Sequence, residues 1–217
     1  MLVNKIIVEQ NELYLQDDEV VINLLSNKLD LFIKGNVYCG IKEFVNKELN
    51  IHLEKNSHFT IEFFLSVLSS KNKIMIYNEE NSKLDLHYAC TFTGENELIV
   101  DSIFSTSNND NKILIRAVEE EGTLLVKAVG SIESKTKNNT YLEDIKAITN
   151  NNNSITIMPD LLVKTDSVTA VHNATISPIE ENELFYLESK GLEKQCATSL
   201  IKEGFLKGIV EKEEIKN

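Results

Sequence analysis

The sequence predicts a mainly β protein that ends in a pair of α-helices. Short segments of alternating apolar and polar residues recur from Val20 to about Val171 at a spacing of about ten residues, with polar turns between them. After His172 the apolar spacing changes to three and four residues, which is typical of helices. The chain of 217 residues is 42% hydrophobic and has only two prolines and eight glycines, which excludes a disordered chain or a glycine-rich repeat.

The predicted strands share an alternating apolar pattern bounded by Asn, Ser, Lys or Glu residues. They are Val20–Leu25, Leu29–Ile33, Phe59–Phe64, Ile74–Tyr77, Leu84–Tyr88, Glu97–Val100, Ile113–Val118, Leu124–Val129, Ile145–Ile148, Ile155–Ile157, Leu161–Val163 and Val168–Val171. In this span, Gly40–Leu49 is the segment whose apolar spacing also permits a helix.

Alternation alone leaves a β-sandwich and a β-solenoid about equally open. Asn-Gly and Asp-Gly, the dipeptides that tight two-residue hairpins prefer, do not occur in the sequence. Asparagine-rich segments such as Asn150–Asn153 suit the polar corners of stacked coils. These two observations favour the solenoid.

The helical end has its own start and stop signals. Ser177-Pro-Ile-Glu180 has the form of a capping box with proline at the first helical position. Gly191 stands where a glycine would end the first helix, and a second helix is expected from about Leu192. We therefore expect a β core over residues 1–176 and a helical region over residues 177–217.

Composition excludes several functions. A net charge of −12 and a single arginine, Arg116, oppose binding to nucleic acid. The sequence has no apolar run close to the roughly 20 residues of a membrane helix and no signal peptide, so we expect a cytoplasmic protein without a membrane partner. Cys39, Cys90 and Cys196 are too far apart for a disulfide framework, a zinc site or a resident cluster on one chain.

His172 is the histidine of most interest, because it ends the last predicted strand before the helices. His52 and His87 are expected on solvent-facing sides of strands, and His58 is expected in a turn. Cys90 is expected in the core, and Cys196 on the packed stripe of the last helix.

The acidic run Glu119–Glu121 is interpreted as a solvated turn. The sequence contains no serine-hydrolase, phosphate-loop or zinc-protease motif. A β-helix enzyme acting on carbohydrate is a remote alternative, because the chain has no tryptophan and only 7% aromatic residues.

The order Val168-x-x-x-His172-x-Ala-Thr, a short spacer, Leu184-Phe-Tyr-Leu-x-Ser-x-Gly-Leu192 and a closing helix resembles the carboxyl-terminal end of the SufB/SufD family. These proteins are scaffolds of SUF iron–sulfur cluster assembly. The resemblance is dense over Pro159–Phe205 and weaker over Leu84–Asn153. It implies a right-handed parallel β-helix closed by the helical hairpin.

The resemblance also implies a function. The chain would be a non-enzymatic scaffold that pairs with a second SufB/D-type subunit, either a copy of itself or a longer relative, around Leu161–His172. Its terminal helices would bind SufC, an ABC-type ATPase, so that this chain itself binds no nucleotide. Phe185, Tyr186, Leu187 and Leu192 are the expected partner-binding residues. The alternative for the hairpin is that it caps the end of the β-helix and buries Phe185, Tyr186 and Leu187 there.

At the pairing interface, the resemblance implies that His172 and Asn173 contribute to assembling a transient iron–sulfur cluster, with His172 as metal ligand. Asn173 replaces the glutamate of the SufB segment His-Glu-Ala-Thr, and an amide supplies no charge to hold ferrous iron. No cysteine occurs from Thr149 to Pro159, where SufB carries one. The chain therefore resembles SufD or a minimal single-type scaffold. A regulatory or interaction subunit that docks the same ATPase without handling a cluster is the competing hypothesis.

Overall fold

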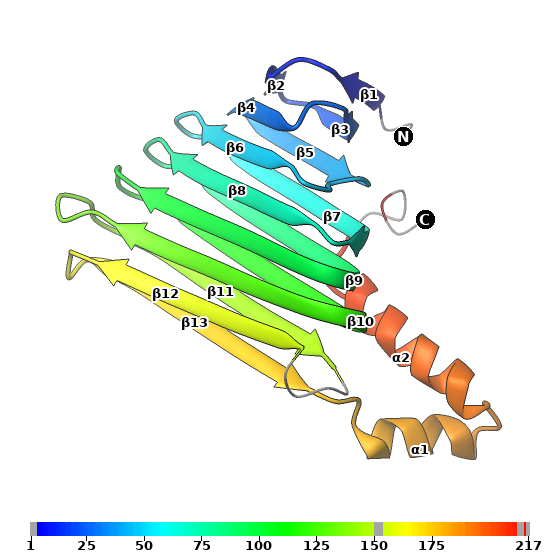
Figure 1. The fold of residues 1–217 in the computed structure, drawn as a ribbon. Coiled ribbons are helices and arrows are strands. Elements are labelled where there is room, and N and C mark those ends of the chain that lie inside the picture. The colour runs from blue at the N-terminus through cyan, green and yellow to red at the C-terminus, as the bar shows by residue number, and fades with distance from the viewer. Residues whose placement is uncertain (1–3, 150–153, 212–214, 216–217) are drawn as a thin grey trace.

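The computed structural model describes residues 4–149, 154–211 and 215 (Figure 1). Its strands are β1 (Asn4–Val8), β2 (Glu12–Gln16), β3 (Glu19–Leu24), β4 (Lys28–Lys34), β5 (Asn36–Ile41), β6 (Glu48–Leu53), β7 (His58–Leu68), β8 (Lys71–Asn78), β9 (Lys83–Phe104), β10 (Asp110–Ile132), β11 (Asn139–Ile148), β12 (Ile155–Val163) and β13 (Val168–Ser177). Two helices follow, α1 (Glu181–Ser189) and α2 (Lys194–Lys207).

The strands form a parallel β-helix. Every strand pairing within the described residues is parallel. On one face β1, β3, β5, β7 and β9 are neighbours, and on the other β2, β4, β6, β8 and β9 are neighbours. The long strands β9 and β10 run through both faces, since β10 pairs first with β11 and then with β12. The predicted mainly β fold, a parallel β-helix followed by a helical hairpin, is confirmed, and the β-sandwich alternative is wrong.

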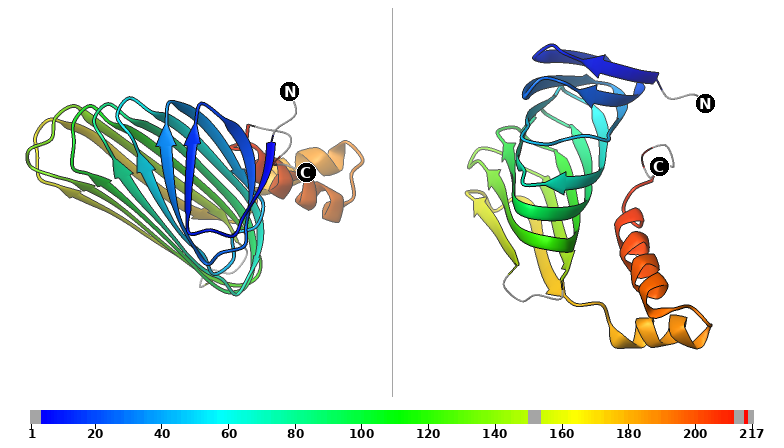
Figure 2. Two further views of the ribbon diagram at one scale, coloured as in Figure 1. Left: turned by 90° about the horizontal axis from the view of Figure 1, so that it is seen from above. Right: turned by 45° about the vertical axis from the view of Figure 1, so that its right-hand side comes forward.

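The β-helix widens along the chain (Figure 2, left). Asn4 pairs with Val20, whereas Ile113 pairs with Glu143, so one coil grows from 16 residues to 30. Later coils therefore enclose a broader interior than earlier ones. The last coil, made by β12 and β13, presents the broad end of the molecule.

One corner of the coils is built from stacked asparagines. Asn56, Asn81, Asn108 and Asn138 each have φ between 55° and 64°, a left-handed conformation that asparagine tolerates better than most residues. Their side chains bond along the stack, with Asn81 Nδ2 donating to Asn56 Oδ1 at 2.7 Å and Asn138 Nδ2 donating to Asn108 Oδ1 at 3.2 Å. The expectation of polar asparagine corners is thus confirmed here, while Asn150–Asn153 lies outside the described residues.

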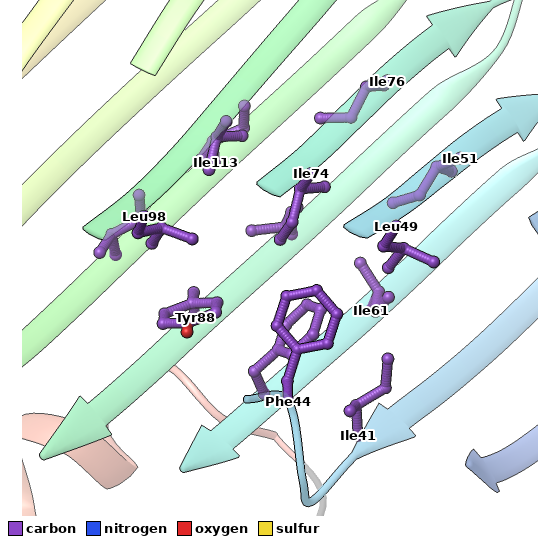
Figure 3. Packing of buried hydrophobic residues seen from close by; sticks show 14 of the residues in the cluster. Ile41, Phe44, Leu49, Ile51, Ile61, Ile74, Ile76, Tyr88, Leu98 and Ile113 are labelled. Carbon is purple, nitrogen blue, oxygen red and sulfur yellow. The ribbon is translucent and has the colours of Figure 1, made fainter. Parts of the chain in front are cut away.

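The interior is a continuous stack of aliphatic and aromatic side chains (Figure 3). Phe44 and Phe63 pack with ring centroids 5.2 Å apart, and Phe63 packs on Tyr88 at 5.1 Å. Cys90 is buried as predicted, and desolvation raises the pKa of its thiol to about 12. A thiol in that state is a packing group and a poor nucleophile.

Two sequence interpretations of local structure are wrong. Gly40–Leu49 is not a helix, because β5 ends at Ile41 and β6 begins at Glu48, where strand pairing with neighbouring coils overrides the local apolar spacing. The segment Glu119–Glu121 is not a turn but part of β10, at a bulge where the register with β9 shifts. The strands β1, β2, β5 and β6 were not among the segments predicted from the sequence.

The first helix begins later than the capping-box pattern predicts. Ser177 is still the last residue of β13, because its carbonyl accepts the backbone N–H of Thr149 at 3.1 Å. Glu180 therefore occupies the N-cap, without a side-chain cap. The predicted stop is confirmed. Gly191 has φ +93°, its N–H bonds Glu188 O, and the N–H of Leu192 bonds Leu187 O, which is the Schellman arrangement.

The helical hairpin lies along the flank of the β-helix (Figure 2, right). The helix α2 packs against β9 and β10 and buries Ala197 and Leu206, whereas α1 has no buried residue. Cys196 is exposed, which corrects the prediction of a packed position, because it lies on a side of α2 that faces solvent. Lys202 Nζ donates to Glu119 O at 3.3 Å and so attaches α2 at the bulge.

Candidate functional site

The broad end of the β-helix is open. Within the described residues, β12 pairs with β10 alone and β13 with β11 alone, so each has a free edge. Edge strands of this length are usually protected by charge or by a covering segment. Here the exposed large apolar side chains on the two strands are Met158, Leu162, Val163, Val171 and Ile176. An apolar edge of this kind is typical of a surface that a partner covers.

His172 lies in the middle of this edge, as the fifth of ten residues in β13. Alternation along the strand places it on the same side as Val168 and Ala170, which pack against the core. It therefore faces the interior side of the β-helix, yet it is exposed.

Asn173, the second predicted interface residue, lies on the opposite face of β13. Successive side chains of a strand point to opposite sides, so His172 faces the interior side while Asn173 faces outward. Both residues are exposed. The two predicted residues are neighbours in the sequence, but the structure directs their side chains to opposite faces of β13 and not to one site.

Glu143 is the residue beside His172 that sequence reasoning missed. The two are register partners in the parallel ladder of β11 and β13, where neighbouring strands lie about 4.8 Å apart. Glu143 is fully buried. Its signal in the sequence is a charged residue on the inward phase of an otherwise apolar alternation, between Tyr141 and Ile145.

The carboxylate of Glu143 is only partly satisfied. Tyr141 Oη donates to Glu143 Oε2 at 2.6 Å, while Glu143 Oε1 is buried and has no hydrogen-bond partner among the described residues. Desolvation raises the pKa of Glu143 to about 7, against the lowering effect of the Tyr141 hydrogen bond. A buried oxygen with an unused acceptor site normally needs an explanation in function or in a bound species.

The other histidines are not part of this site, and one of them corrects a prediction. His87 is buried and not solvent-facing, with Nδ1 3.2 Å from Glu62 Oε1. Glu62 is also buried and accepts the backbone N–H of Glu211 at 2.6 Å, so the segment after α2 covers this outer face of the sheet. The alternation of apolar and polar residues along a strand cannot show that a distant segment covers its outer face. A tail that binds a buried carboxylate fixes the end of α2 to the β-helix.

His52 and His58 lie on the outer surface. The ring of His52 is stacked between Phe32 and Tyr77, with centroid distances of 4.6 and 5.0 Å, and is partly buried. His58 is not in a turn as predicted, because it begins β7, where its Nε2 lies 2.9 Å from Asp85 Oδ2. In the part of the chain that the structure describes, no group of three or more His, Cys, Asp or Glu side chains is placed to hold a metal ion.

The predicted partner-binding residues form an exposed surface on the hairpin. Phe185 is 71% exposed and Tyr186 60% exposed, which excludes the alternative that the hairpin buries both. Leu192 is also exposed, and Leu187 is partly buried. Tyr186 and Leu187 line a groove of about 630 Å³ between α1, α2 and the end of β11.

The fold and its open end define the class of this protein: a parallel β-helix with an apolar edge at one end and a helical hairpin on its flank. None of the helices that the structure describes has the length and apolar character to cross a membrane. Residues 51–205 match the family described as "SUF system FeS cluster assembly, SufBD core domain". The chain belongs to this SufBD core family.

Individual relatives agree with this family. The chain is 25% identical to the iron–sulfur cluster assembly protein SufD of Plasmodium berghei. The similarity covers 95% of this chain and 15% of that protein. It is 29% identical to a SufBD family protein of Staphylococcus haemolyticus over 47% of this chain and 20% of the relative. It is 41% identical to a SufBD family protein of Mycobacterium bovis over 24% of this chain and 6% of the relative. The chain thus spans a fifth or less of the length of these relatives.

Proposed function

We propose that this chain is a scaffold subunit of a SUF-type iron–sulfur cluster assembly complex. It acts without catalysing a reaction of its own, pairs through its open end with a second SufB/D-type subunit, and docks a SufC-like ABC ATPase through its helical hairpin. The observation that carries the proposal is the apolar edge of β12 and β13 with the exposed His172 at its centre. We place cluster assembly by this complex in the cytoplasm, where the unpaired thiols of Cys39, Cys90 and Cys196 would stay reduced.

Pairing at the open end is supported by the interactions that a second subunit would add to β12 and β13. A second subunit would supply hydrogen-bond partners to β12 and β13 and cover their exposed apolar side chains. Burial of such side chains favours association, because it removes apolar surface from water. The transient cluster would form at this contact, where His172 contributes an imidazole ligand and iron is cargo.

Docking of the ATPase is supported by the exposed aromatic residues and the groove beside them. Phe185 and Tyr186 have the size and polarity of interface anchors. The hairpin that carries them is attached to the β-helix by side-chain contacts: the guanidinium of Arg116 lies 5.9 Å from the Phe205 ring and bonds Asp144 on β11. Because Asp144 adjoins Glu143, a movement of the hairpin by nucleotide-driven closure of the ATPases could reach the open end through these residues.

Truncation of the aromatic anchors tests the docking surface. We expect the double variant Phe185→Ala/Tyr186→Ala to bind the SufC-like ATPase from the same genome at least about 30-fold more weakly, since each anchor contributes on the order of 1–2 kcal/mol. Isothermal titration calorimetry measures the affinity. The control is Leu68→Ala, which removes an equally exposed apolar side chain from the end of β7. Equal weakening by both changes would contradict a specific site on the hairpin.

The regulatory-subunit hypothesis is favoured by the position of the thiols. Cys39 and Cys90 are buried in the core and Cys196 lies on α2, so none of the three belongs to β12 or β13. A chain of this kind could dock the ATPase and modulate its partner without holding sulfur.

Anaerobic reconstitution separates the two hypotheses. With iron, sulfide, the ATPase and the partner subunit present, we expect the scaffold to develop the visible absorption of an iron–sulfur cluster. The variant His172→Ala should reduce the iron and sulfide retained at least about tenfold, the effect typical of losing a metal ligand or its close support. The variant His52→Ala serves as the control, because His52 lies on the outer face of β6. A colourless wild-type complex would support the regulatory role, and full retention by His172→Ala would remove His172 from the site.

A further inference from the structure

We propose that the residues after α2 form a strap that holds the helical hairpin against the outer face of the β-helix, and that the ATPase docks preferentially once this strap has left its seat. The strap consists of residues 208–211 and 215. The gating of ATPase docking rests on the function proposed above. The strap itself is a property of this chain alone and can be tested without a partner.

The seat of the strap is shaped by a glycine. Gly40, Glu62 and His87 are register partners on neighbouring strands β5, β7 and β9. Ile215 is buried against this row, and a Cβ built on Gly40 would overlap its Cδ1 atom. Any side chain at position 40 would therefore compete with Ile215 for the same space.

A buried carboxylate makes the second contact with the strap. Glu62 Oε1 accepts the backbone N–H of Glu211 at 2.6 Å, and Glu62 Oε2 accepts Tyr38 Oη at 2.5 Å. His87 Nδ1 lies 3.2 Å from Glu62 Oε1, whereas its Nε2 is buried and has no hydrogen-bond partner in the described part of the chain. Burial of these polar groups costs free energy that hydration would return if the strap left. The polar floor thus opposes the apolar seating of Ile215 and makes release accessible.

The strap and the end of α2 form one packing unit. Val210 and Ile215 belong with Leu206 to an apolar cluster on the outer face, separate from the interior core. The helix α2 buries only Ala197 and Leu206, and α1 buries no residue. Among the described residues, the strap thus buries two apolar side chains, as many as both helices together. Its release would leave the hairpin weakly held, because segments with few buried contacts open first.

The joint between α2 and the strap is weakened by two glycines. Gly204 lies in the last part of α2 and Gly208 is its C-cap, with the N–H of Gly208 donating to Gly204 O at 3.0 Å. Glycine loses more backbone entropy in a helix than other residues do. The chain can therefore bend at these two positions while every strand stays paired.

Gly40→Ala tests the strap, because alanine is tolerated in a β-strand but fills the seat of Ile215. Hydrogen–deuterium exchange of the full chain, followed by mass spectrometry, measures the opening of each segment. We expect Gly40→Ala and Ile215→Ala each to lower the protection of residues 194–211 by at least about tenfold, while β7 and β9 keep wild-type protection. The double variant should open no more than Gly40→Ala alone, because both changes break the same contact.

Leu25→Ala is the control for this experiment, since Leu25 is an exposed aliphatic residue that follows β3 and lies outside the cluster beneath the strap. Wild-type protection of residues 194–211 in Gly40→Ala would overturn the proposal. An equal loss of protection in Leu25→Ala, or losses that add in the double variant, would do the same.

Affinity for the SufC-like ATPase tests the gating. If the ATPase binds the released hairpin, its apparent affinity rises in proportion to the released fraction, so Gly40→Ala should bind about tenfold more tightly than wild type in isothermal titration calorimetry. Faster exchange with an unchanged affinity would overturn the gating and leave the docking function standing. Absence of binding by wild type and variant alike would overturn the docking function together with the gating, and the exchange result would still decide whether the strap holds the hairpin.

Discussion

Replacing Gly122 with alanine is expected to destabilise the β-helix by about 3 kcal/mol or more, because an alanine there meets both a clash and a disfavoured backbone conformation. Gly122 has φ +123°, and a Cβ built on it would lie 2.2 Å from the backbone oxygen of Gly94 in the adjacent coil. Backbone atoms cannot move aside as the end of a side chain can, so the two long strands β9 and β10 would have to separate.

For a protein of this size, that loss corresponds to a decrease of roughly 6–12 °C in the melting temperature. Thermal unfolding followed by circular dichroism measures it. The control is Gly204→Ala, where a Cβ would meet no atom within 4 Å and lies on a helix. Alanine there should raise the stability by about 1 kcal/mol, because glycine is a poor helix former. Similar melting temperatures for both variants would contradict the close stacking of Gly94 and Gly122.

The same position connects the fold to the proposed partner surface. The bulge before Gly122 provides the Glu119 carbonyl that Lys202 of α2 contacts. Glu120 Oε1 also lies 3.3 Å from Lys202 Nζ. The chain thus uses the irregular point in its longest strand to attach the hairpin.

Strand alternation predicted most of the β-helix but could not show which faces are covered. The segment around Leu84–Tyr88 was placed correctly in β9, and its alternation put His87 on the outer side. That side is nevertheless buried, because residues after α2 return to bind Glu62 beside it. Contacts between segments so far apart in the sequence leave no trace in a local apolar pattern.

Of the two register partners His172 and Glu143, the sequence singles out only the histidine, for a related reason. His172 was identified because it precedes an abrupt change of periodicity, a local signal. Glu143 became its neighbour only through the register of β11 and β13, which joins residues a whole coil apart. Without a register, a single glutamate in a strand of ten residues gives no reason to connect it with a histidine further along the chain.

Glu143 is expected to make the stability of the protein depend on pH between about 4.5 and 7. Burial raises the pKa of its carboxyl from the ordinary value of 4.5 to about 7 in the folded state. Because the folded-state pKa is raised, folding favours the protonated acid. Stability is therefore greatest below the unfolded-state pKa, decreases as the pH rises to about 7, and is constant above it. The decrease amounts to up to about 3 kcal/mol, the free energy of a shift of this size.

Glu143→Gln keeps the shape of the side chain and removes the charge. We expect the variant to match the wild type near pH 4.5 and to exceed its unfolding free energy by up to about 3 kcal/mol near pH 8. Urea unfolding at both pH values measures the difference. Glu133→Gln is the control, because Glu133 is an exposed partner of Lys164 and its replacement should change stability by less than about 1 kcal/mol. If the unfolding free energies of Glu143→Gln and wild type change in parallel over this range, the pKa of Glu143 is not raised by folding. The carboxylate is then ionised in the folded protein, and its buried oxygen must be in contact with water or a cation in solution.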